Sequence, residues 1–335
     1  MATFSNGLTP LMVAAQHGRV DVMRALLDHP SADAAAMMRH ARSGGGTVLM
    51  EAVHHVDAMR LLLDHPCADP AAMMMHTDDR GSTALIRAAV NGLANAMSLM
   101  LDHPAADATA MMLHASHDGS TALGWAALTG RVDAMHLLLY HPYADPAAAM
   151  QHTDNHGTTA LMWAASSGRV EPLRMLLEHS CADPAAMFHT RADGDSALTW
   201  AAKFAARGGA YHLQKDLPTR RCVPLLFLLQ RVPMHSHLSG AQQEHMTTVM
   251  EALWGGEDAD AHGHSSLLFV VDPNLDDARD ECVVLLLERG ARGFDSHNLV
   301  MTRIISGLAR RARDTESINL AVVGMAIKWQ QQQQQ

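Results

Sequence analysis

The sequence is poor in the features that mark secreted and membrane proteins. Its 335 residues include only four cysteines, too few for a disulfide framework. No apolar stretch reaches the roughly 18 residues needed to span a bilayer, and the first residues lack the basic and apolar regions of a signal peptide. We therefore expect a chain with no membrane partner, located in the cytoplasm, with the nucleus as the alternative.

Basic residues and catalytic motifs are also scarce. The chain has 25 Lys and Arg against 35 Asp and Glu, and its basic residues are scattered, so a nucleic-acid partner is not expected. The sequence contains no phosphate-binding loop, dinucleotide fingerprint, zinc-protease motif or nucleophile elbow. These absences predict a protein that is not an enzyme and that uses no cofactor.

What the sequence does contain is an internal repeat. The strings LTPLMVAA, GTVLMEA, STALIRAA, STALGWAA, TTALMWAA and DSALTWAA align on a hydroxyl residue, at intervals of 38, 36, 38, 38 and 37 residues. In each unit the hydroxyl residue caps a first helix, which a glycine such as Gly130 usually ends, and a leucine-rich second helix stops near a His-Pro pair. Two such helices cannot bury their apolar faces alone, so the units are expected to stack. The aligned hydroxyl residues are Thr9, Thr47, Thr83, Thr121, Thr159 and Ser196.

The run GLTPLMVAAQHGRVDVMRALLDH, residues 7–29, resembles an ankyrin repeat. It shares the T-P-L-x-x-A-A-x-x-G frame and the leucine-rich second helix of that family. The resemblance implies an all-α, ankyrin-type helical repeat solenoid of about eight repeats. The chain departs from the family pattern at the position after the framework leucine, where the family usually has His and this chain has Met12, Met50, Ile86, Gly124, Met162 and Thr199.

Residues 1–329 are expected to form a single solenoid. A long His-rich connection is expected at 233–263 and a polyglutamine stub at 330–335. The glutamines also suggest that the chain could be an adaptor module of a larger protein. The repeats are expected at 7–43, 45–79, 81–117, 119–155, 157–193, 194–232, 264–297 and 298–329.

The inter-repeat finger, which runs from the end of each second helix to the next capping residue, is longer than in the family. Asp69 followed by Pro70 is typical of a helix N-cap with proline at the first position, and the alanines and methionines that follow favour a helix. The sequence therefore predicts an extra short helix in each finger. The corresponding capping residues are Asp33, Asp69, Asp107, Asp145 and Asp183.

Histidine is the one enriched polar residue, with 23 copies. Equivalent residues in stacked repeats lie roughly 10 Å apart, whereas zinc ligands lie about 2 Å from the metal, so successive repeats are not expected to combine their histidines in a zinc site. A structural role is expected for the first series. The first series, expected to bond free carbonyls at the ends of second helices, is His29, His65, His103, His141 and His179; the second is His40, His76, His114, His152 and His189. The connection at 234–264 supports an alternative function as a histidine-based metal-binding or metal-responsive scaffold, with His235, His237, His262 and His264 as ligands.

The clearest functional signal is a ladder of tryptophans. Only 4% of the chain is aromatic, yet Trp125, Trp163 and Trp200 each lie four residues after a capping residue. In the resembled family this position faces a concave groove that binds partners; the alternative is that the rings only cover a neighbouring connection. We expect a non-enzymatic scaffold or adaptor, monomeric, that binds an unidentified protein or peptide. The expected contact residues are Trp125, Trp163, Trp200, Arg87, Glu51, Asn91, Leu128, Ser167, Lys203, Phe204, Asp79, Arg80, Asp118, Asn155 and His156.

Overall fold

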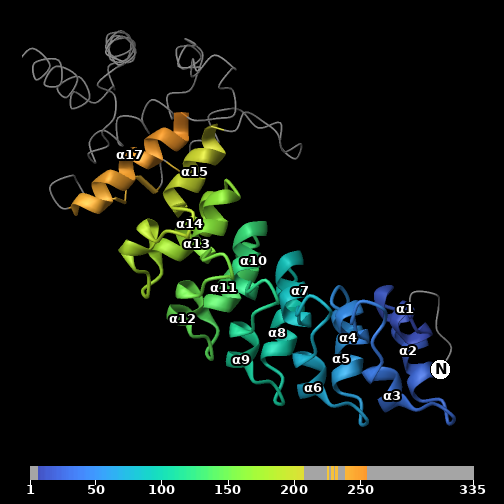
Figure 1. Ribbon diagram of the computed structural model, residues 1–335. Coiled ribbons are helices and arrows are strands. Elements are labelled where there is room, and N and C mark those ends of the chain that lie inside the picture. Colours follow the sequence, from blue (N-terminus) through green and yellow to red (C-terminus); the bar gives the residue numbers. More distant parts are fainter. Residues whose placement is uncertain (1–6, 207–224, 226–227, 230, 233–237, 255–335) are drawn as a thin grey trace, which may run out of the picture. The chain divides into compact units, whose positions relative to one another are not determined.

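The computed structural model describes residues 7–206, 225, 228–229, 231–232 and 238–254 (Figure 1). The chain divides into two compact units, Met1–Gly194 and Asp195–Gln335, so the division falls where the sequence predicts repeat six to begin. The predicted repeats at 264–297 and 298–329, most of the connection and the polyglutamine stub lie outside the described residues. The count of eight repeats and the single solenoid over 1–329 therefore stay predictions.

The first unit is a stack of helix pairs, and its described residues contain no β-strand. First helices pack on first helices and second helices on second helices along the stack (Figure 1). The all-helical repeat architecture expected from the sequence is therefore present. The pairs are α1 (Pro10–Gln16) with α2 (Val20–Leu27), α4 (Val48–Glu51) with α5 (Val56–Leu63), α7 (Ala84–Asn91) with α8 (Ala94–Leu101), α10 (Ala122–Thr129) with α11 (Val132–Tyr140), and α13 (Ala160–Ser166) with α14 (Val170–Glu178).

The first helices are short and closely packed because of their caps and alanines. The Oγ1 atom of Thr121 accepts the Gly124 N–H, and Ala126 and Ala127 are fully buried, so neighbouring helices can approach closely. The helix ends at Gly130, whose φ of 67° is the left-handed conformation of a C-terminal cap. Equivalent cap bonds are made by Thr9, Thr83 and Thr159.

Thr47 is the exception among the capping threonines. It precedes α4, the four-residue first helix of repeat two, and its buried Oγ1 has no hydrogen-bond partner in the described part of the chain. Burying an unsatisfied hydroxyl costs free energy, whereas a functioning cap contributes about 1 kcal/mol. A threonine hydroxyl at the capping position therefore destabilises the fold at Thr47 and stabilises it at Thr121.

Replacing Thr47 by Val is expected to leave the free energy of unfolding unchanged or to raise it by up to about 1 kcal/mol, because the lost hydroxyl made no bond. The matched change Thr121→Val removes a cap bond and is expected to cost about 1 kcal/mol. Urea unfolding followed by circular dichroism measures both. Equal losses for the two variants would show that Thr47 is bonded in solution.

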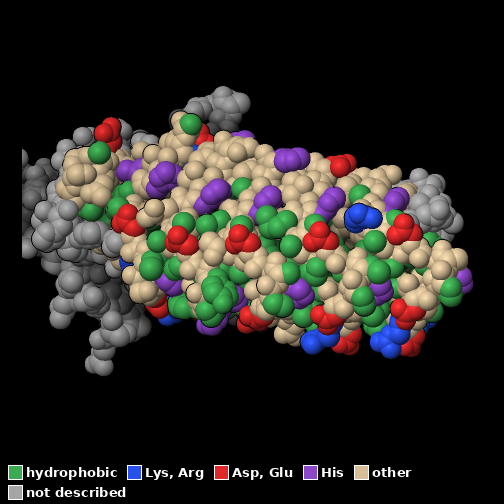
Figure 2. Space-filling view, turned by 90° about the horizontal axis from the view of Figure 1, so that it is seen from below, with side chains coloured by type: hydrophobic (Ala, Val, Ile, Leu, Met, Phe, Trp, Pro, Cys, Tyr) green, Lys and Arg blue, Asp and Glu red, His purple; other side chains and the backbone are tan. Residues whose placement is uncertain are grey.

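A third helix lies in every finger of the first unit, at the predicted place. Each begins directly after its aspartate, whose Oδ1 accepts a backbone N–H of the first turn, as Asp69 does from Ala72 at 3.1 Å. Viewed from the side of these helices, histidine and acidic side chains recur in rows along the repeats, with hydrophobic side chains between them (Figure 2). The third helices are α3 (Ala34–Arg39), α6 (Pro70–Met75), α9 (Ala108–Leu113), α12 (Pro146–Gln151) and the 3-10 helix η1 (Pro184–Phe188).

The second histidine series links the end of each repeat to its beginning. His40, His76, His114 and His152 follow the third helices, and each Nε2 lies 2.8 to 3.0 Å from the carbonyl oxygen of the glycine that begins the same repeat. Because a carbonyl only accepts, Nε2 must carry the hydrogen in each ring. These four residues therefore have a structural role, which the sequence predicted only for the first series. The acceptors are Gly7, Gly45, Gly81 and Gly119.

The first histidine series lies where the sequence placed it, but its contacts differ from the expectation. The Nδ1 atoms of these rings accept a backbone N–H two residues later, at 3.1 to 3.3 Å. The expected bonds to free helix carbonyls are thus wrong for Nδ1, because the turn that follows each histidine supplies a backbone N–H donor to this atom. On the other side of the ring, His141 Nε2 lies 3.3 Å from Asp102 Oδ1 of the preceding repeat.

In the second unit, α15 (Ala197–Ala206) packs against α17 (Gly240–Trp254). The capping Ser196 has its Oγ 2.7 Å from Nε2 of His245 on α17. Burial lowers the pKa of His245, against the opposing effect of the Asp195 carboxylate. Among the described residues of the chain, no helix is both long and apolar enough to cross a bilayer.

Candidate functional site

The ladder position of the first helices defines the candidate surface in the first unit. We call this surface, made by Val13, Glu51, Arg87, Trp125 and Trp163, the first-helix face. Four of these side chains are half-buried, and Glu51 is buried. The face changes along the stack, from a charged part in repeats two and three to an aromatic part in repeats four and five.

The aromatic part combines two rings on helices that pack against each other, α10 and α13. A Cβ added to Gly124 would lie 3.5 Å from Cδ1 of Trp163, so the Trp163 ring lies beside the backbone of the preceding first helix. Gly124 occupies one of the positions where the sequence departs from the family's histidine. The Trp163 ring therefore packs in part against the neighbouring repeat, in line with the alternative that the rings only cover adjacent structure. Both tryptophans are half-buried, so part of each ring is also accessible to a partner.

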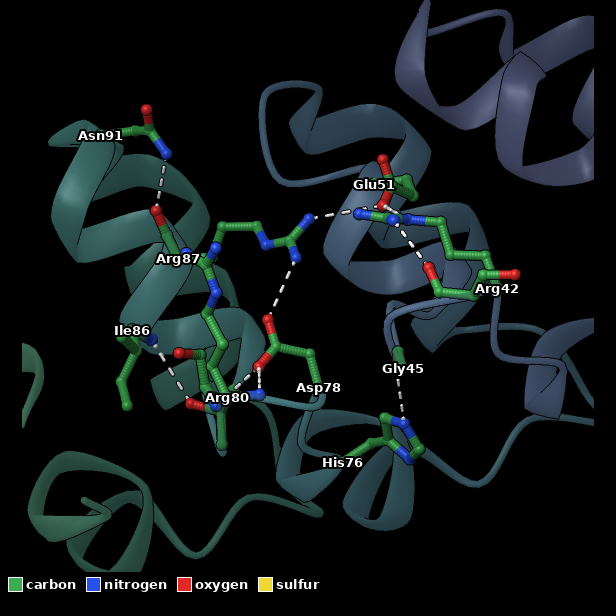
Figure 3. A network of polar contacts seen from close by, with 12 residues as sticks. Arg42, Gly45, Glu51, His76, Asp78, Arg80, Ile86, Arg87 and Asn91 are labelled. Atoms are coloured by element: carbon green, nitrogen blue, oxygen red, sulfur yellow. Dashed lines mark hydrogen bonds and ion pairs between the residues drawn. The ribbon is translucent and has the colours of Figure 1, made fainter. Parts of the chain in front are cut away.

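The charged part is a network centred on Glu51 (Figure 3). Its carboxylate accepts from Arg42 Nε at 2.8 Å and from Arg87 Nη1 at 3.4 Å, and Gln16 of repeat one also donates to it. Arg87 Nη2 lies 3.4 Å from the Asp78 carboxylate. The network therefore joins three successive repeats through one buried carboxylate.

The environment keeps Glu51 ionised. Burial alone would raise its pKa, but the hydrogen bonds from Gln16 and Arg42 and the charges of Arg42 and Arg87 together hold the pKa below its usual value of 4.5. With only 8% of its surface exposed, Glu51 has little area left for a partner. The Arg87 side chain, 25% exposed, is the member of this pair that faces solvent.

The other expected residues of the first helices make local bonds. Asn91 Nδ2 donates to the Arg87 carbonyl at 2.8 Å, and Ser167 Oγ donates to the Ala164 carbonyl at 2.7 Å. Leu128 is half-buried. These residues lie next to the ladder, but two of them already satisfy backbone groups of their own helix.

The finger tips, residues 40–46, 76–82, 114–120 and 152–158, carry the remaining expected residues of this unit. Asp118 Oδ1 accepts from Ser116 and Ser120, which shapes its own turn. Asn155 Nδ2 donates to the His117 carbonyl of the preceding tip at 2.8 Å. The expected tip residues all have exposed side chains, namely Asp79, Arg80, Asp118, Asn155 and His156.

Trp200, Lys203 and Phe204 belong to the second unit. Asp195 accepts from Trp200 Nε1 at 3.1 Å and from Lys203 Nζ at 2.6 and 2.7 Å. Burial would raise the Asp195 pKa, but these hydrogen bonds and the lysine charge lower it. Two expected partner-binding residues are thus engaged in a polar cluster at the start of α15.

The alternative metal ligands His235, His237, His262 and His264 lie outside the described residues. Within the part of the chain that the structure describes, no three His, Cys, Asp or Glu side chains come together as a metal site. Sequence reasoning missed Gln16 and Arg42, which complete the Glu51 network, because neither lies at a ladder position. It also gave no role to Tyr140 and Tyr143, whose side chains are among the most exposed large ones.

Comparison with known families agrees with the repeat geometry. A family model described as ankyrin repeats in three copies matches residues 2–74 and 69–150, and a single ankyrin repeat matches 156–187. A comparison with curated proteins finds no match. Ankyrin repeats are generally protein–protein interaction modules rather than enzymes, and the matched segments together cover more than half of the chain. The chain therefore belongs to the ankyrin repeat family.

Proposed function

We propose that the chain is a non-enzymatic adaptor that binds a protein or peptide segment on the first-helix face of repeats three to five. Trp125 and Trp163 would be the apolar anchors, and the Arg87 guanidinium would bind a polar group at the other end of the segment. The observation that carries the proposal is the pair of half-buried tryptophans on adjacent first helices, in a chain with only five tryptophans.

Two features support binding by these rings. Trp163 lies against the helix that carries Trp125, which restricts its motion before a partner arrives, so less entropy is lost on binding. Tryptophan is also enriched among the residues that dominate interface energetics. At the charged end, Glu51 and Asp78 hold Arg87 from two sides, so its guanidinium is already oriented.

The test is a peptide selected from a displayed library against the purified full chain. The double change Trp125→Ala and Trp163→Ala is expected to lower the affinity for that peptide by about 10- to 100-fold. Hot-spot aromatic residues typically contribute at least about 1 to 2 kcal/mol to the binding free energy. Isothermal titration calorimetry measures the affinity, and circular dichroism measures helix content.

Val13→Ala is the matched control, since Val13 occupies the same ladder position in repeat one. It should leave the affinity unchanged. Unchanged affinity in the double variant would contradict the proposal, and so would a loss of helix content equal to the loss of binding, because the rings would then be core residues.

A further inference from the structure

A different surface stands out when the repeats are compared with one another. At the last position of the second helix or directly after it, repeats one, two, three and five carry Asp28, Asp64, Asp102 and Glu178, whereas repeat four carries Tyr140. Three residues later the same four repeats carry Ser31, Cys67, Ala105 and Cys181, whereas repeat four carries Tyr143. Four repeats stack without a tyrosine at either position, so the two tyrosines are not required for the repeat fold.

These tyrosines are exposed but held in place. Tyr140 and Tyr143 are 53% and 64% exposed. The Tyr140 ring stacks on His136 with centroids 4.7 Å apart and contacts His179 of repeat five at 4.9 Å. The Tyr143 ring lies 5.7 Å from His141, and the Tyr143 carbonyl accepts from Thr109 of repeat three. Repeat four thus presents two braced aromatic faces to solvent.

The surroundings of Tyr143 are acidic. His141 Nε2 lies 3.3 Å from Oδ1 of Asp102, so a phenol, an imidazole and a carboxylate follow one another along the surface. The Asp102 side chain is 69% exposed. Asp145, two residues after Tyr143, is exposed as well. An aromatic face next to exposed carboxylates matches a cationic side chain, which the ring quadrupole and the carboxylate attract together.

Asp102 also borders a hollow between α5 and α8. The walls of the hollow are mostly apolar and include Val56, Leu99 and Pro104, with Arg60 on the α5 side. Ser98 on α8 is a shorter side chain than Arg60, its equivalent on α5, so it fills less of the space there. A carboxylate and an apolar hollow are therefore adjacent on one side of the second helices.

We propose that the second-helix side of repeats two to four is a second docking surface, for a peptide segment with an Arg or Lys and a neighbouring apolar residue. The basic side chain would lie on Tyr143 and pair with Asp102, and the apolar side chain would enter the hollow between α5 and α8. Arg60, which also lines the hollow, disfavours a basic residue there, so the apolar and not the basic side chain of the segment would enter it.

The probe is a positional-scanning library of octapeptides. The bait is the full chain carrying Trp125→Ala and Trp163→Ala, so that binding through the first-helix face is suppressed and the two proposals are tested separately. Peptides with Arg or Lys and an adjacent apolar residue are expected to be enriched. Enrichment of acidic peptides, or none at all, would overturn the inference.

The variant Tyr143→Ser tests the aromatic face with little risk to the fold, because Ser31 occupies the same position in repeat one. The variant is expected to lower the affinity for the most enriched peptide by about three- to fivefold, which corresponds to the loss of an exposed cation–π contact. Asp102→Asn should lower the affinity for this peptide by a similar factor and make the affinity less dependent on salt. The matched change Asp64→Asn in repeat two should alter neither the affinity nor its salt dependence.

Fluorescence anisotropy of the labelled peptide measures these affinities. Binding that survives both Tyr143→Ser and Asp102→Asn would overturn the proposed surface. A second copy of the chain is the other candidate occupant, and it gives a different result: sedimentation velocity would then show a dimer that Tyr143→Ser dissociates, and the peptide assignment would be wrong.

Discussion

Replacing Glu51 by Gln is expected to lower the free energy of unfolding by about 2 to 3 kcal/mol at pH 7, because two arginines would lose the buried carboxylate that pairs with them. Gln keeps the size of the side chain but supplies one neutral acceptor in place of a charged pair of oxygens. The loss should be largest in repeats one to three, which the network joins. Chemical unfolding gives the total, and hydrogen exchange gives its location.

The same variant gives a pH signature with a defined sign. The pKa of Glu51 is lower in the folded protein than its usual 4.5, so the ionised form stabilises the fold above that pH, and this stabilisation is lost as the pH falls through the folded pKa. The difference in unfolding free energy between wild type and Glu51→Gln should therefore be full at pH 7 and shrink as the pH falls below about 4.5.

Glu171→Gln is the matched control for both measurements. Glu171 pairs with Arg174 at 3.6 Å on the surface of α14, with 63% of its side chain exposed. Exposed pairs of this kind contribute at most about 0.5 kcal/mol. If the two variants lose the same stability, or if the Glu51→Gln difference grows in acid, the network does not hold the repeats together in the way described.

Gly119→Ala is expected to cost about 3 kcal/mol, since two penalties coincide at this position. Gly119 has a φ of 83°, in the left-handed region that residues with a Cβ disfavour. Its Cβ would also lie 2.6 Å from the backbone nitrogen of Asn155 and 2.9 Å from Cα of Asp154, in the next finger tip. Backbone atoms cannot turn aside as a flexible side chain can, so the tips must separate.

Gly194→Ala isolates the first penalty, that of the backbone conformation. Gly194 has the same φ of 83°, but no atom in the described part of the chain lies within 4 Å of its would-be Cβ. Its cost should be only about 1 kcal/mol, from the backbone conformation alone. Hydrogen exchange at residues 152–158 should accelerate in Gly119→Ala and stay unchanged in Gly194→Ala. Equal costs would mean that contact between finger tips contributes nothing to stability.

The elements of the fold could be predicted because their signals are local. Thr121, Gly130 and the Asp69-Pro70 pair each act within one turn of a helix, and their spacing repeats, so every copy reinforced the same interpretation. Thr47 shows where this reasoning stops. Its sequence context resembles the other caps, but its hydroxyl lacks a partner in the described residues, which no spacing could have indicated.

The candidate site was predicted less completely because its contacts cross repeats. Glu51 lies at the ladder position and was expected to face a partner, yet Gln16 and Arg42 come from repeat one and its finger and cover it. Likewise, the spacing that aligned Trp200 with Trp125 and Trp163 could not show that Asp195 accepts from its indole. The sequence located the surface through its aromatic residues, but the partners of each polar group depend on the stacking.

The ties between repeats have a consequence for the order in which the chain is made. In the ties formed by Arg131, Asn155 and Arg169, the donor belongs to the later repeat and the acceptor carbonyl to the earlier one, whereas Gln16 and Thr109 donate in the opposite direction. During synthesis the earlier repeat leaves the ribosome first, so these donors of repeats four and five arrive when their acceptors are already in place. Assembly of the first unit can thus advance in the direction of translation, with each completed repeat as the template for the next.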